Sequence, residues 1–524
     1  MCLMSLAVQA DEPNQSKPEP MNQKNEPFIR TREVISSTPF GGWVKKSMPL
    51  ELRQQSFLPF WSDARLRKHL EMLHAFGFNS IQITVPAVAL WCGADMESWS
   101  VRQRFMLKTA RELGMSTAQF VWGSAIADPS LPASGQQVAE LDWHKPEQRA
   151  KLEAWYRRQA ECAPLVDRVI THWVDPGYGS AHCKECSIDT VVEMHNFILK
   201  IYREKNPNVR GALSVWFMQP GKIWPGYEGA SKLAAHSELE PKTDIALGLM
   251  NYGADGDNLD FAGELKIADL EGIAAAGRRS GVWGWYTTDN EINPALHVRT
   301  KVLQNYFRHL ASHGGSRLAW HSVDDNFPGL NIANLYVAGK LMQDPALDAD
   351  KLLEEFARSF VGEQNAPALT AALRAVEQGR TRSMLYAARV EDAVAPPADW
   401  QKTRSPLPTT WLDDTTTAVD AAIAGMKSVK LAPDFKTAWP VTMEPAEYLG
   451  ELNAHLEAIR QMLAFLKGVR EVEKLQAEGA PNEKLEAAIA ALPKVVYDPA
   501  HTAGLEADIY KQKLAALKKV VGVK

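Results

Sequence analysis

Three groups of acidic residues stand out because each lies just past a short apolar run. They are Asp175, the pair Asp289 and Glu291, and the pair Asp324 and Asp325. Two carboxylates that flank a glycosidic bond can hydrolyse it, since one protonates the leaving oxygen while the other attacks or activates water. We predict Asp175 as the general acid and Glu291 or Asp289 as its partner. Each acid alone is also suited to capping a helix, and Asp324 and Asp325 fit that simpler role best.

Aromatic, amide and imidazole side chains gather near the ends of the same apolar runs. Flat rings stack on the apolar faces of sugar rings, while amides, imidazoles and carboxylates bind sugar hydroxyls. A single tryptophan at such a place usually only packs, but rings recur at most of these positions. The pattern favours a carbohydrate site, and the predicted substrate-binding residues are Trp43, Gln119, Trp122, His172, Trp173, Trp216, Gln219, Asn251, Tyr252, Trp285, Tyr286, Trp320, His321, Asp324 and Asp325.

The apolar runs themselves alternate with amphipathic segments of helical period from Phe28 onward. Eight such strand–helix units predict a (β/α)8 barrel, in which ligands bind at the C-terminal ends of the strands. A doubly wound open sheet is the alternative, but no glycine-rich phosphate-binding pattern follows the first strand. The predicted strands are Glu33–Val44, Ser80–Val85, Thr117–Trp122, Val166–Val174, Gly211–Gln219, Asp244–Tyr252, Gly281–Thr287 and Arg317–Val323.

After Pro345 the strand pattern ends and helical periodicity continues alone. One long stripe of Leu and Ile between Leu449 and Leu466 repeats at three and four residues, as on the buried face of a helix. The predicted fold class is therefore α/β, a (β/α)8 TIM barrel followed by an all-helical C-terminal domain. We expect a catalytic barrel over residues 28–346 and a helical domain over 347–524, either purely structural or forming part of the site's rim.

Composition limits the classes of partner. The chain has 524 residues, a net charge of −5 and a pI near 6.3, which gives no support for a nucleic-acid partner. No stretch is apolar for long enough to predict a membrane span. Residues 1–27 read as the end of a signal peptide, Leu3–Ala10, and a disordered spacer, so we expect a periplasmic or secreted protein; a frayed cytosolic N-terminus is the alternative.

The five cysteines are too few for a disulfide scaffold, but two of them form a Cys-x-x-Cys pair at Cys183 and Cys186. The pair fits half of a zinc site completed by His172, Cys162 or Cys92, a disulfide in an exported protein, or two thiols that shape a loop. A second ligand pair at matching spacing is missing, so the loop-shaping role is favoured. We predict no metal and no cofactor.

The segment Trp173-Val-Asp-Pro-Gly, followed by His182-Cys-Lys-Glu-Cys186, resembles the strand-four region of glycoside hydrolases with (β/α)8 barrels. These are the α-glucuronidase and β-hexosaminidase-like group and related polysaccharide-utilisation proteins. Leu335–Pro345, followed by Leu352–Val361 and Gly362, is similar to the segment that closes such barrels and opens a helical tail. The chain departs from the group in having Asp175 where a glutamate is frequent, and in lacking an N-terminal β-domain before the barrel. The resemblance implies hydrolysis of a glycosidic bond in a polysaccharide or oligosaccharide.

Two other functions fit the same residues. A barrel that binds carbohydrate without catalysis would keep the aromatic strand ends but would not bring two carboxylates together. A metal-dependent barrel hydrolase or lyase would use the histidines and aspartates as ligands instead.

Overall fold

The computed structural model describes most of the chain at the level of individual side chains. A few side chains inside these ranges, among them those of Trp216 and Trp285, are not described. The described residues are 26–36, 50–84, 88–131, 138–172, 187–216, 230–250, 267–285, 296–312, 314–325, 329–380, 410–496, 498, 500–501 and 504–520.

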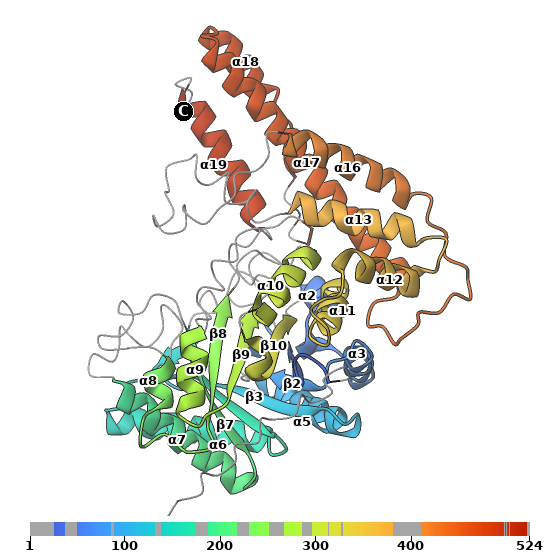
Figure 1. Cartoon of the computed structure of the whole chain (residues 1–524). Coiled ribbons are helices and arrows are strands. Elements are labelled where there is room, and N and C mark those ends of the chain that lie inside the picture. Colours follow the sequence, from blue (N-terminus) through green and yellow to red (C-terminus); the bar gives the residue numbers. More distant parts are fainter. Residues whose placement is uncertain are drawn as a thin grey trace, which may run out of the picture.

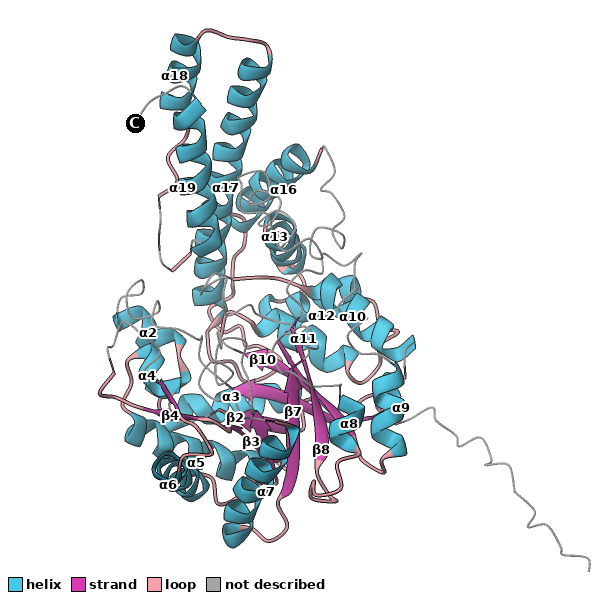
Figure 2. Cartoon of the chain, turned by 90° about the vertical axis from the view of Figure 1, so that its left-hand side faces the viewer, coloured by secondary structure: helices cyan, strands magenta, loops and turns pink. Residues whose placement is uncertain are grey.

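Eight parallel strands close into a barrel in the order β1-β10-β9-β8-β7-β6-β3-β2 (Figures 1 and 2). Each of the eight overlaps a strand predicted from the sequence, and the prediction of a TIM barrel followed by helices is confirmed. The barrel strands are β1 (Thr31–Ser36), β2 (Ser80–Ile83), β3 (Ser116–Trp122), β6 (Arg168–His172), β7 (Arg210–Trp216), β8 (Asp244–Met250), β9 (Ser280–Trp285) and β10 (Leu318–Asp325).

Helices surround the barrel and bury its outer face. Outward-facing strand residues such as Ile81, Ile83, Val169 and Val323 belong to one large hydrophobic core shared with these helices. The surrounding helices are α2 (Leu50–Ser56), α3 (Asp63–Ala75), α4 (Val88–Cys92), α5 (Met96–Glu112), α6 (Pro146–Cys162), α7 (Ile188–Lys205), α8 (Ala230–Ala234), α9 (Ile267–Ala275), α10 (Thr300–Ser312) and α11 (Ile332–Leu341), with 3-10 turns η2 (Leu58–Phe60) and η4 (Gly315–Arg317).

The loops after the first three strands are more elaborate than the sequence pattern predicts. A two-stranded antiparallel ribbon, β4 (Ala125–Ala127) and β5 (Val138–Glu140), follows β3. The short helices α2 and α4 were also not predicted. Segments of three to seven residues carry too few periodic positions to be recognised from a single sequence.

Side chains that point into the barrel alternate between large and small, so that the interior is filled. Trp320 lies across Gly281 of the neighbouring strand, where an added Cβ would stand 2.0 Å from the indole. Small residues from other strands, Ala118, Ala212 and Ala246, share this layer. The barrel is therefore a packed core here, and Gly281 is required because the indole occupies the space of a side chain.

The N-terminal end of the barrel contains an ion cluster. The Arg168 guanidinium is paired with the fully buried carboxylate of Glu33 and lies 4.0 Å above the Trp320 ring. Beside them, Asp244 accepts from Arg210 at 2.8 Å and from Arg279 at 2.9 Å. Burial raises the pKa of Glu33, while the charge of Arg168 opposes that shift. Because charged side chains occupy this end, a ligand site is expected at the opposite, C-terminal end.

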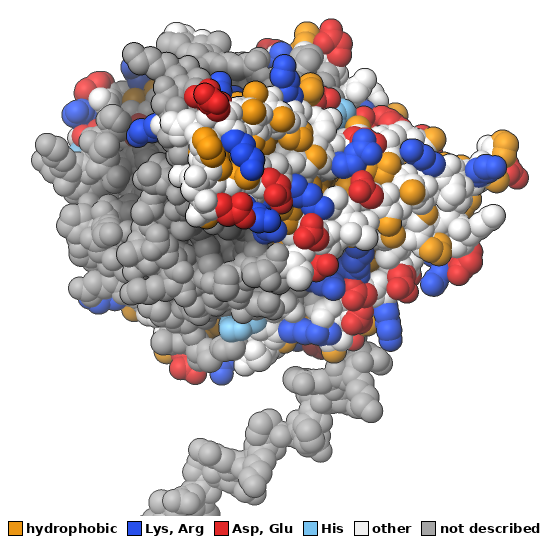
Figure 3. Space-filling model, turned by 90° about the horizontal axis from the view of Figure 1, so that it is seen from above, with side chains coloured by type: hydrophobic (Ala, Val, Ile, Leu, Met, Phe, Trp, Pro, Cys, Tyr) orange, Lys and Arg blue, Asp and Glu red, His pale blue; other side chains and the backbone are white. Residues whose placement is uncertain are grey.

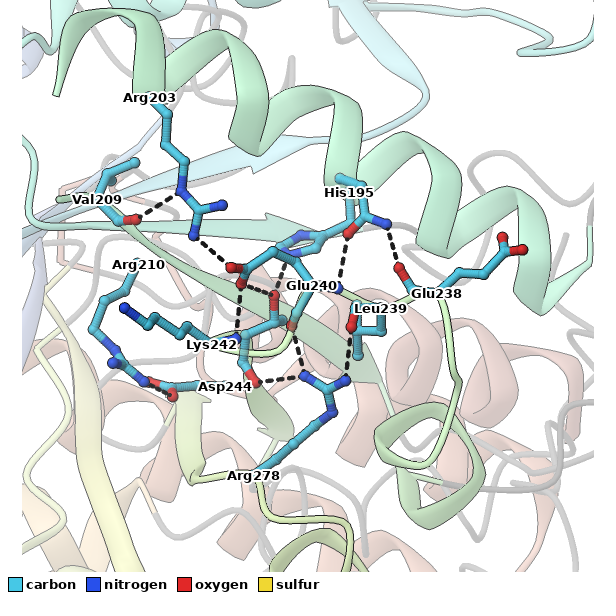
Figure 4. Close-up of polar contacts among 12 residues, drawn as sticks. His195, Arg203, Val209, Arg210, Glu238, Leu239, Glu240, Lys242, Asp244 and Arg278 are labelled. Atoms are coloured by element: carbon cyan, nitrogen blue, oxygen red, sulfur yellow. Dashed lines mark hydrogen bonds and ion pairs between the residues drawn. The ribbon is translucent and has the colours of Figure 1, made fainter. Parts of the chain in front are cut away.

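The loop that leads into β8 is fixed at the same N-terminal end (Figure 4). Arg278 donates to the carbonyl of Glu240 at 2.7 Å, and the carboxylate of Glu240 accepts from Arg203 at 2.8 Å. His195 lies 3.0 Å from the hydroxyl of Thr243. These contacts use the polar groups of the loop internally, which suits a structural role for this face.

Helices after residue 348 form the C-terminal region, which lies above the barrel in the views of Figures 1 and 2. Leu452, Leu456, Ile459 and Leu463 of its longest helix are buried, as the stripe of apolar residues predicts. Among the described residues, no helix is both long and apolar enough to cross a membrane. The helices of this region are α12 (Ala349–Val361), α13 (Ala366–Gly379), α16 (Trp411–Met426), α17 (Pro445–Ala477), α18 (Asn482–Ala490) and α19 (Gly504–Val520).

Candidate active site at the barrel mouth

Three rings form a layer inside the C-terminal half of the barrel. The rings of Phe120 and Trp283 are stacked, with centroids 5.0 Å apart and planes 15° from parallel. His172 lies 5.1 Å from each of them. These residues come from β3, β9 and β6, and we call them the aromatic layer. Because they point inward above the small residues around Trp320, they form the floor of any pocket at the mouth.

His172 places a neutral imidazole in this floor. Burial lowers its pKa to about 3, so the ring is uncharged at neutral pH. Its Nδ1 lies 3.1 Å from the Ser214 hydroxyl on the next strand, β7. A neutral imidazole beside a hydroxyl can donate one hydrogen bond and accept another, as recognition of a sugar hydroxyl requires.

Trp122 and Asp324 lie on the same inner face, nearer the mouth. Trp122 is the last residue of β3, two positions beyond Phe120, and its ring is half-buried against the core. Asp324 pairs in register with Ile35, which points into the barrel, so the two side chains share the inner face. The structure therefore brings predicted residues Trp122, His172 and Asp324 together at one end of one pore.

The amide of Gln82 joins this floor to the ion cluster. In the orientation that satisfies both neighbours, it donates to Glu33 at 3.1 Å and accepts from the Trp283 indole at 3.2 Å. The position of the Trp283 ring is thus fixed by a hydrogen bond as well as by stacking. A floor held in this way is preorganised for a ligand.

Two residues predicted to bind substrate point instead into the surrounding helices. Gln119 is fully buried and accepts a 2.6 Å hydrogen bond from the Tyr202 hydroxyl of α7. His321 is also fully buried and lies 2.8 Å from the Tyr306 hydroxyl of α10. Successive side chains of a strand point to opposite faces, so one of each adjacent pair must leave the pore. These two side chains therefore lie outside the inner face of the barrel.

Asp325 likewise faces outward, one residue beyond Asp324. Its Oδ2 lies 3.4 Å from Nε2 of His69 on α3, and both side chains are fully buried. Burial, followed by the neighbouring charge of Asp324, raises the pKa of the Asp325 carboxyl to about 8. Burial and then Arg65 lower the pKa of His69 to about 3. Near neutral pH this pair therefore consists of a protonated acid and a neutral imidazole.

Trp320 does point into the barrel, but it lies below the aromatic layer rather than at the mouth. Its ring contacts Arg168 of the ion cluster and fills the space over Gly281. Trp320 therefore packs the barrel interior and lies deeper than the substrate-binding position that the sequence predicts for it.

Several predicted site residues lie outside the described part of the chain. The strands β7 and β9 end at Trp216 and Trp285, but those two side chains are not described. The predicted general acid and both candidates for its partner are among the undescribed residues. The full set is Trp43, Trp173, Asp175, Gln219, Asn251, Tyr252, Tyr286, Asp289 and Glu291, together with Cys183 and Cys186.

The sequence reading missed three residues of the floor, Phe120, Ser214 and Trp283. Each lies two positions before a residue that the sequence did single out, namely Trp122, Trp216 and Trp285. Continuing the period-2 alternation one step back along each strand would have found all three.

Metal-ligating side chains do not converge in the described part of the chain. There, no three His, Cys, Asp or Glu side chains gather closely enough to hold an ion. Cys92 and Cys162 are buried thiols, and Cys92 donates to the Ala89 carbonyl.

Charges of both signs are mixed over the described surface. Seen from above in Figure 3, Lys and Arg side chains alternate with Asp and Glu side chains across it, without a large area of one sign. This mixture agrees with the modest net charge of the whole chain.

Comparisons with known proteins bear on the fold. No protein-family model and no curated protein matches the sequence. The structure is similar to a glycoside hydrolase family 138 enzyme that targets the pectin rhamnogalacturonan II, with 11% identity, a TM-score of 0.55, and coverage of 94% of this chain and 63% of that one. A mutant O-GlcNAc hydrolase from Thermobaculum terrenum has 11% identity, a TM-score of 0.47, and coverage of 94% and 96%. The resemblance to glycoside hydrolases is thus confirmed at the level of the fold.

Proposed function

We propose that this protein is a glycoside hydrolase that cleaves a glycosidic bond in a polysaccharide or oligosaccharide. One observation carries the proposal: Phe120, His172, Trp283 and Trp122 line the inner face at the C-terminal ends of the strands, and the carboxylate of Asp324 joins them there. Rings that stack on a sugar and polar groups that bind its hydroxyls suit a carbohydrate better than a phosphate or a hydride donor. The fold it shares with a glycoside hydrolase supports the same choice.

In the proposed mechanism, Asp175 protonates the leaving oxygen and Glu291 or Asp289 is the partner carboxylate. The support is topological, because Asp175 follows β6 and the other two follow β9, and β7 and β8 separate these two strands around the closed barrel. Loops from strands separated in this way can hold one carboxylate on each side of a bond. A separation of roughly 5–5.5 Å would give retention of configuration, and roughly 6.5–9.5 Å inversion.

Asp324 and His172 are proposed to bind substrate hydroxyls rather than to transfer protons. Because the imidazole of His172 is neutral at pH 7, it suits hydrogen bonding and not the role of a charged acid. Asp324 lies on the inner face of β10 at the C-terminal end of the strand, next to the strand β9 that leads to the proposed partner carboxylate.

The test is a screen of the purified chain against polysaccharides and oligosaccharides, with release of reducing ends as the readout. Rhamnogalacturonan fragments belong in the panel because the family 138 enzyme of similar fold targets that pectin. On a substrate that is cleaved, Asp175→Asn and Glu291→Gln should each lower kcat, since positioned acids and bases contribute roughly 10²–10⁴-fold. Sugar binding measured by calorimetry should persist. Asp434→Asn, at an exposed position in the helical region, is the matched control.

Three other outcomes would change the proposed residue roles or the proposed function. Near-full activity of Asp175→Asn would remove that residue from the role of acid. Sugar binding without any cleavage across the panel would favour a non-catalytic carbohydrate-binding barrel. Loss of activity on chelation would favour a metal-dependent hydrolase or lyase.

We also propose that the protein is exported to the periplasm or secreted, where polysaccharides are encountered. The support is the apolar run that ends in Val8 and Ala10 with the spacing of a small-residue cleavage site. Sequencing the N-terminus of the protein recovered from its producing cells should give Asp11 as the first residue. An intact Met1 in the cytosolic fraction would contradict export.

A further inference from the structure

The connection between β9 and α10 ends in a buried stretch, Leu296–Arg299, that is not helical. Its four side chains are between 3% and 8% exposed. The helix α10 begins only after this stretch, at Thr300. A buried backbone segment outside regular structure must find other partners for its polar groups. Here the partners come from two different parts of the chain.

The first anchor is Asn334 of α11, on the barrel side. Its Nδ2 donates to the His297 carbonyl at 2.7 Å, and its Oδ1 accepts from the Arg299 backbone N–H at 2.8 Å. One amide thus binds the backbone of two alternate residues of the stretch, and so satisfies polar groups that no helix or strand satisfies here. Asn334 also donates to Asn331 at 2.8 Å, and Asn331 lies close to the end of β10, where its Nδ2 donates to the carbonyl of Asp324 at 3.4 Å.

The second anchor comes from the C-terminal helical region. Arg380, directly after α13, donates from Nη1 to the Leu296 carbonyl at 2.9 Å. Glu377, one turn earlier in α13, accepts from the Thr300 hydroxyl at 3.0 Å and from the Lys301 backbone N–H at 2.9 Å. A carboxylate at this place satisfies one of the N–H groups in the first turn of α10 and is favoured by the helix dipole.

Arg380 is itself fixed from two further segments of the helical region. Nη1 lies 3.1 Å from Nδ1 of His455 on α17, and Nη2 donates to the carbonyl of His501. The His501 ring is held between Asp498 at 2.7 Å and Glu451 at 3.0 Å. Arg380 is only 4% exposed, so its planar guanidinium has little freedom to move.

We propose that Arg380 and Glu377 are positioning residues, through which the helical region fixes the end of the β9–α10 connection, from Leu296 to Lys301. This inference rests on the proposed function, because the same connection carries Asp289 and Glu291, the candidates for the partner carboxylate. Glu291 lies only five residues before the carbonyl that Arg380 binds. The helical region is then part of the catalytic unit, because it fixes the point at which the segment carrying that carboxylate joins α10.

Kinetics of Arg380→Gln test the effect on catalysis. Displacing a catalytic group by about 1 Å costs on the order of 100-fold in rate, so we expect kcat to fall roughly 10- to 100-fold with KM little changed. Arg380→Lys keeps the charge and one donor toward Leu296, and should restore part of kcat. The control is Arg358→Gln, which removes an exposed ion pair with Glu363 in the same region. An unchanged kcat in Arg380→Gln would overturn the positioning role.

Hydrogen–deuterium exchange tests the contact independently of any activity. Amides of residues 281–301 should exchange faster in Arg380→Gln than in the parent or in Arg358→Gln, while those of the other barrel strands stay protected. If Arg380→Gln does not fold, Glu377→Ala supplies a milder change at the same connection. Unchanged exchange there would refute the inference, whichever substrate is found. If the parent cleaves nothing, the proposed function fails, and faster exchange at this connection would still establish that the helical region holds it.

Discussion

Replacing Asp325 with asparagine should stabilise the protein at neutral pH, although Asp325 is fully buried beside His69. The carboxyl has a pKa of about 8 in the folded chain, against an ordinary value of 3.8. Between these two values the folded state holds a proton that the unfolded state has released. For such a raised pKa, stability is greatest at low pH and is lost as the pH rises toward the folded value. Asparagine resembles the protonated acid in shape and does not titrate.

The size of the effect follows from the two pKa values. Each pKa unit corresponds to about 1.4 kcal/mol. Keeping Asp325 protonated in the folded chain at pH 7 therefore lowers the free energy of unfolding by about 1.4 × (7 − 3.8), or about 4 kcal/mol. Between pH 5 and pH 7 the advantage of Asp325→Asn should therefore grow by about 3 kcal/mol. His69 contributes little to this difference because its own pKa of about 3 keeps it neutral in both proteins over that range.

Chemical denaturation followed by tryptophan fluorescence at pH 5, 6 and 7 measures this difference. The parent and Asp325→Asn should diverge steadily as the pH rises, with similar slopes against denaturant concentration, since the surface exposed on unfolding is unchanged. The exposed Asp434→Asn is the control and should follow the parent at every pH.

Lower stability of Asp325→Asn than of the parent at pH 7 would refute the reasoning. That result would mean that Asp325 and His69 form a buried ion pair, because removing one member of such a pair typically costs about 3–5 kcal/mol. A stability difference between the two proteins that stays constant from pH 5 to pH 7 would also refute it. That result would show that Asp325 binds the same number of protons in the folded and unfolded states over this range.

Gly281→Ala should overpack the barrel, because its Cβ would stand 2.0 Å from the Trp320 indole; a loss of about 1–3 kcal/mol or more should appear as a lower Tm. Trp122→Ala should raise KM for a cleaved sugar roughly several-fold with little change in kcat, since an aromatic contact contributes about 0.5–1.5 kcal/mol; an unchanged KM would place the sugar elsewhere. The hydrogen bond to Glu451, and then that to Asp498, raises the pKa of His501, so its contribution to stability is present below about pH 6.5 and lost as the pH rises through the higher folded value. The Tm of His501→Gln should accordingly fall below that of the parent at pH 6 and approach it at pH 9, and a constant difference would contradict the pairing.

The sequence by itself determined the barrel and the helical region that follows it. Hydrophobic periodicity is a local property, and it changes from alternating in the strands to a three-and-four pattern in α17, where Leu452, Leu456 and Ile459 are buried as expected. It also located His172 and Trp122, because a residue at the C-terminal end of a barrel strand must lie near the mouth.

Only the tertiary structure decided which side chains of a strand end enter the pore. Asp324 and Asp325 look equivalent in the sequence, yet the closed sheet sends one inward and the other against His69 of α3. Likewise, nothing near Leu296 in the sequence reveals that Arg380, 84 residues later, binds its carbonyl. The packing of the elements around one another decides which face of a strand is the inner one. It also decides which distant side chain satisfies a buried backbone group. Local sequence patterns do not contain this information.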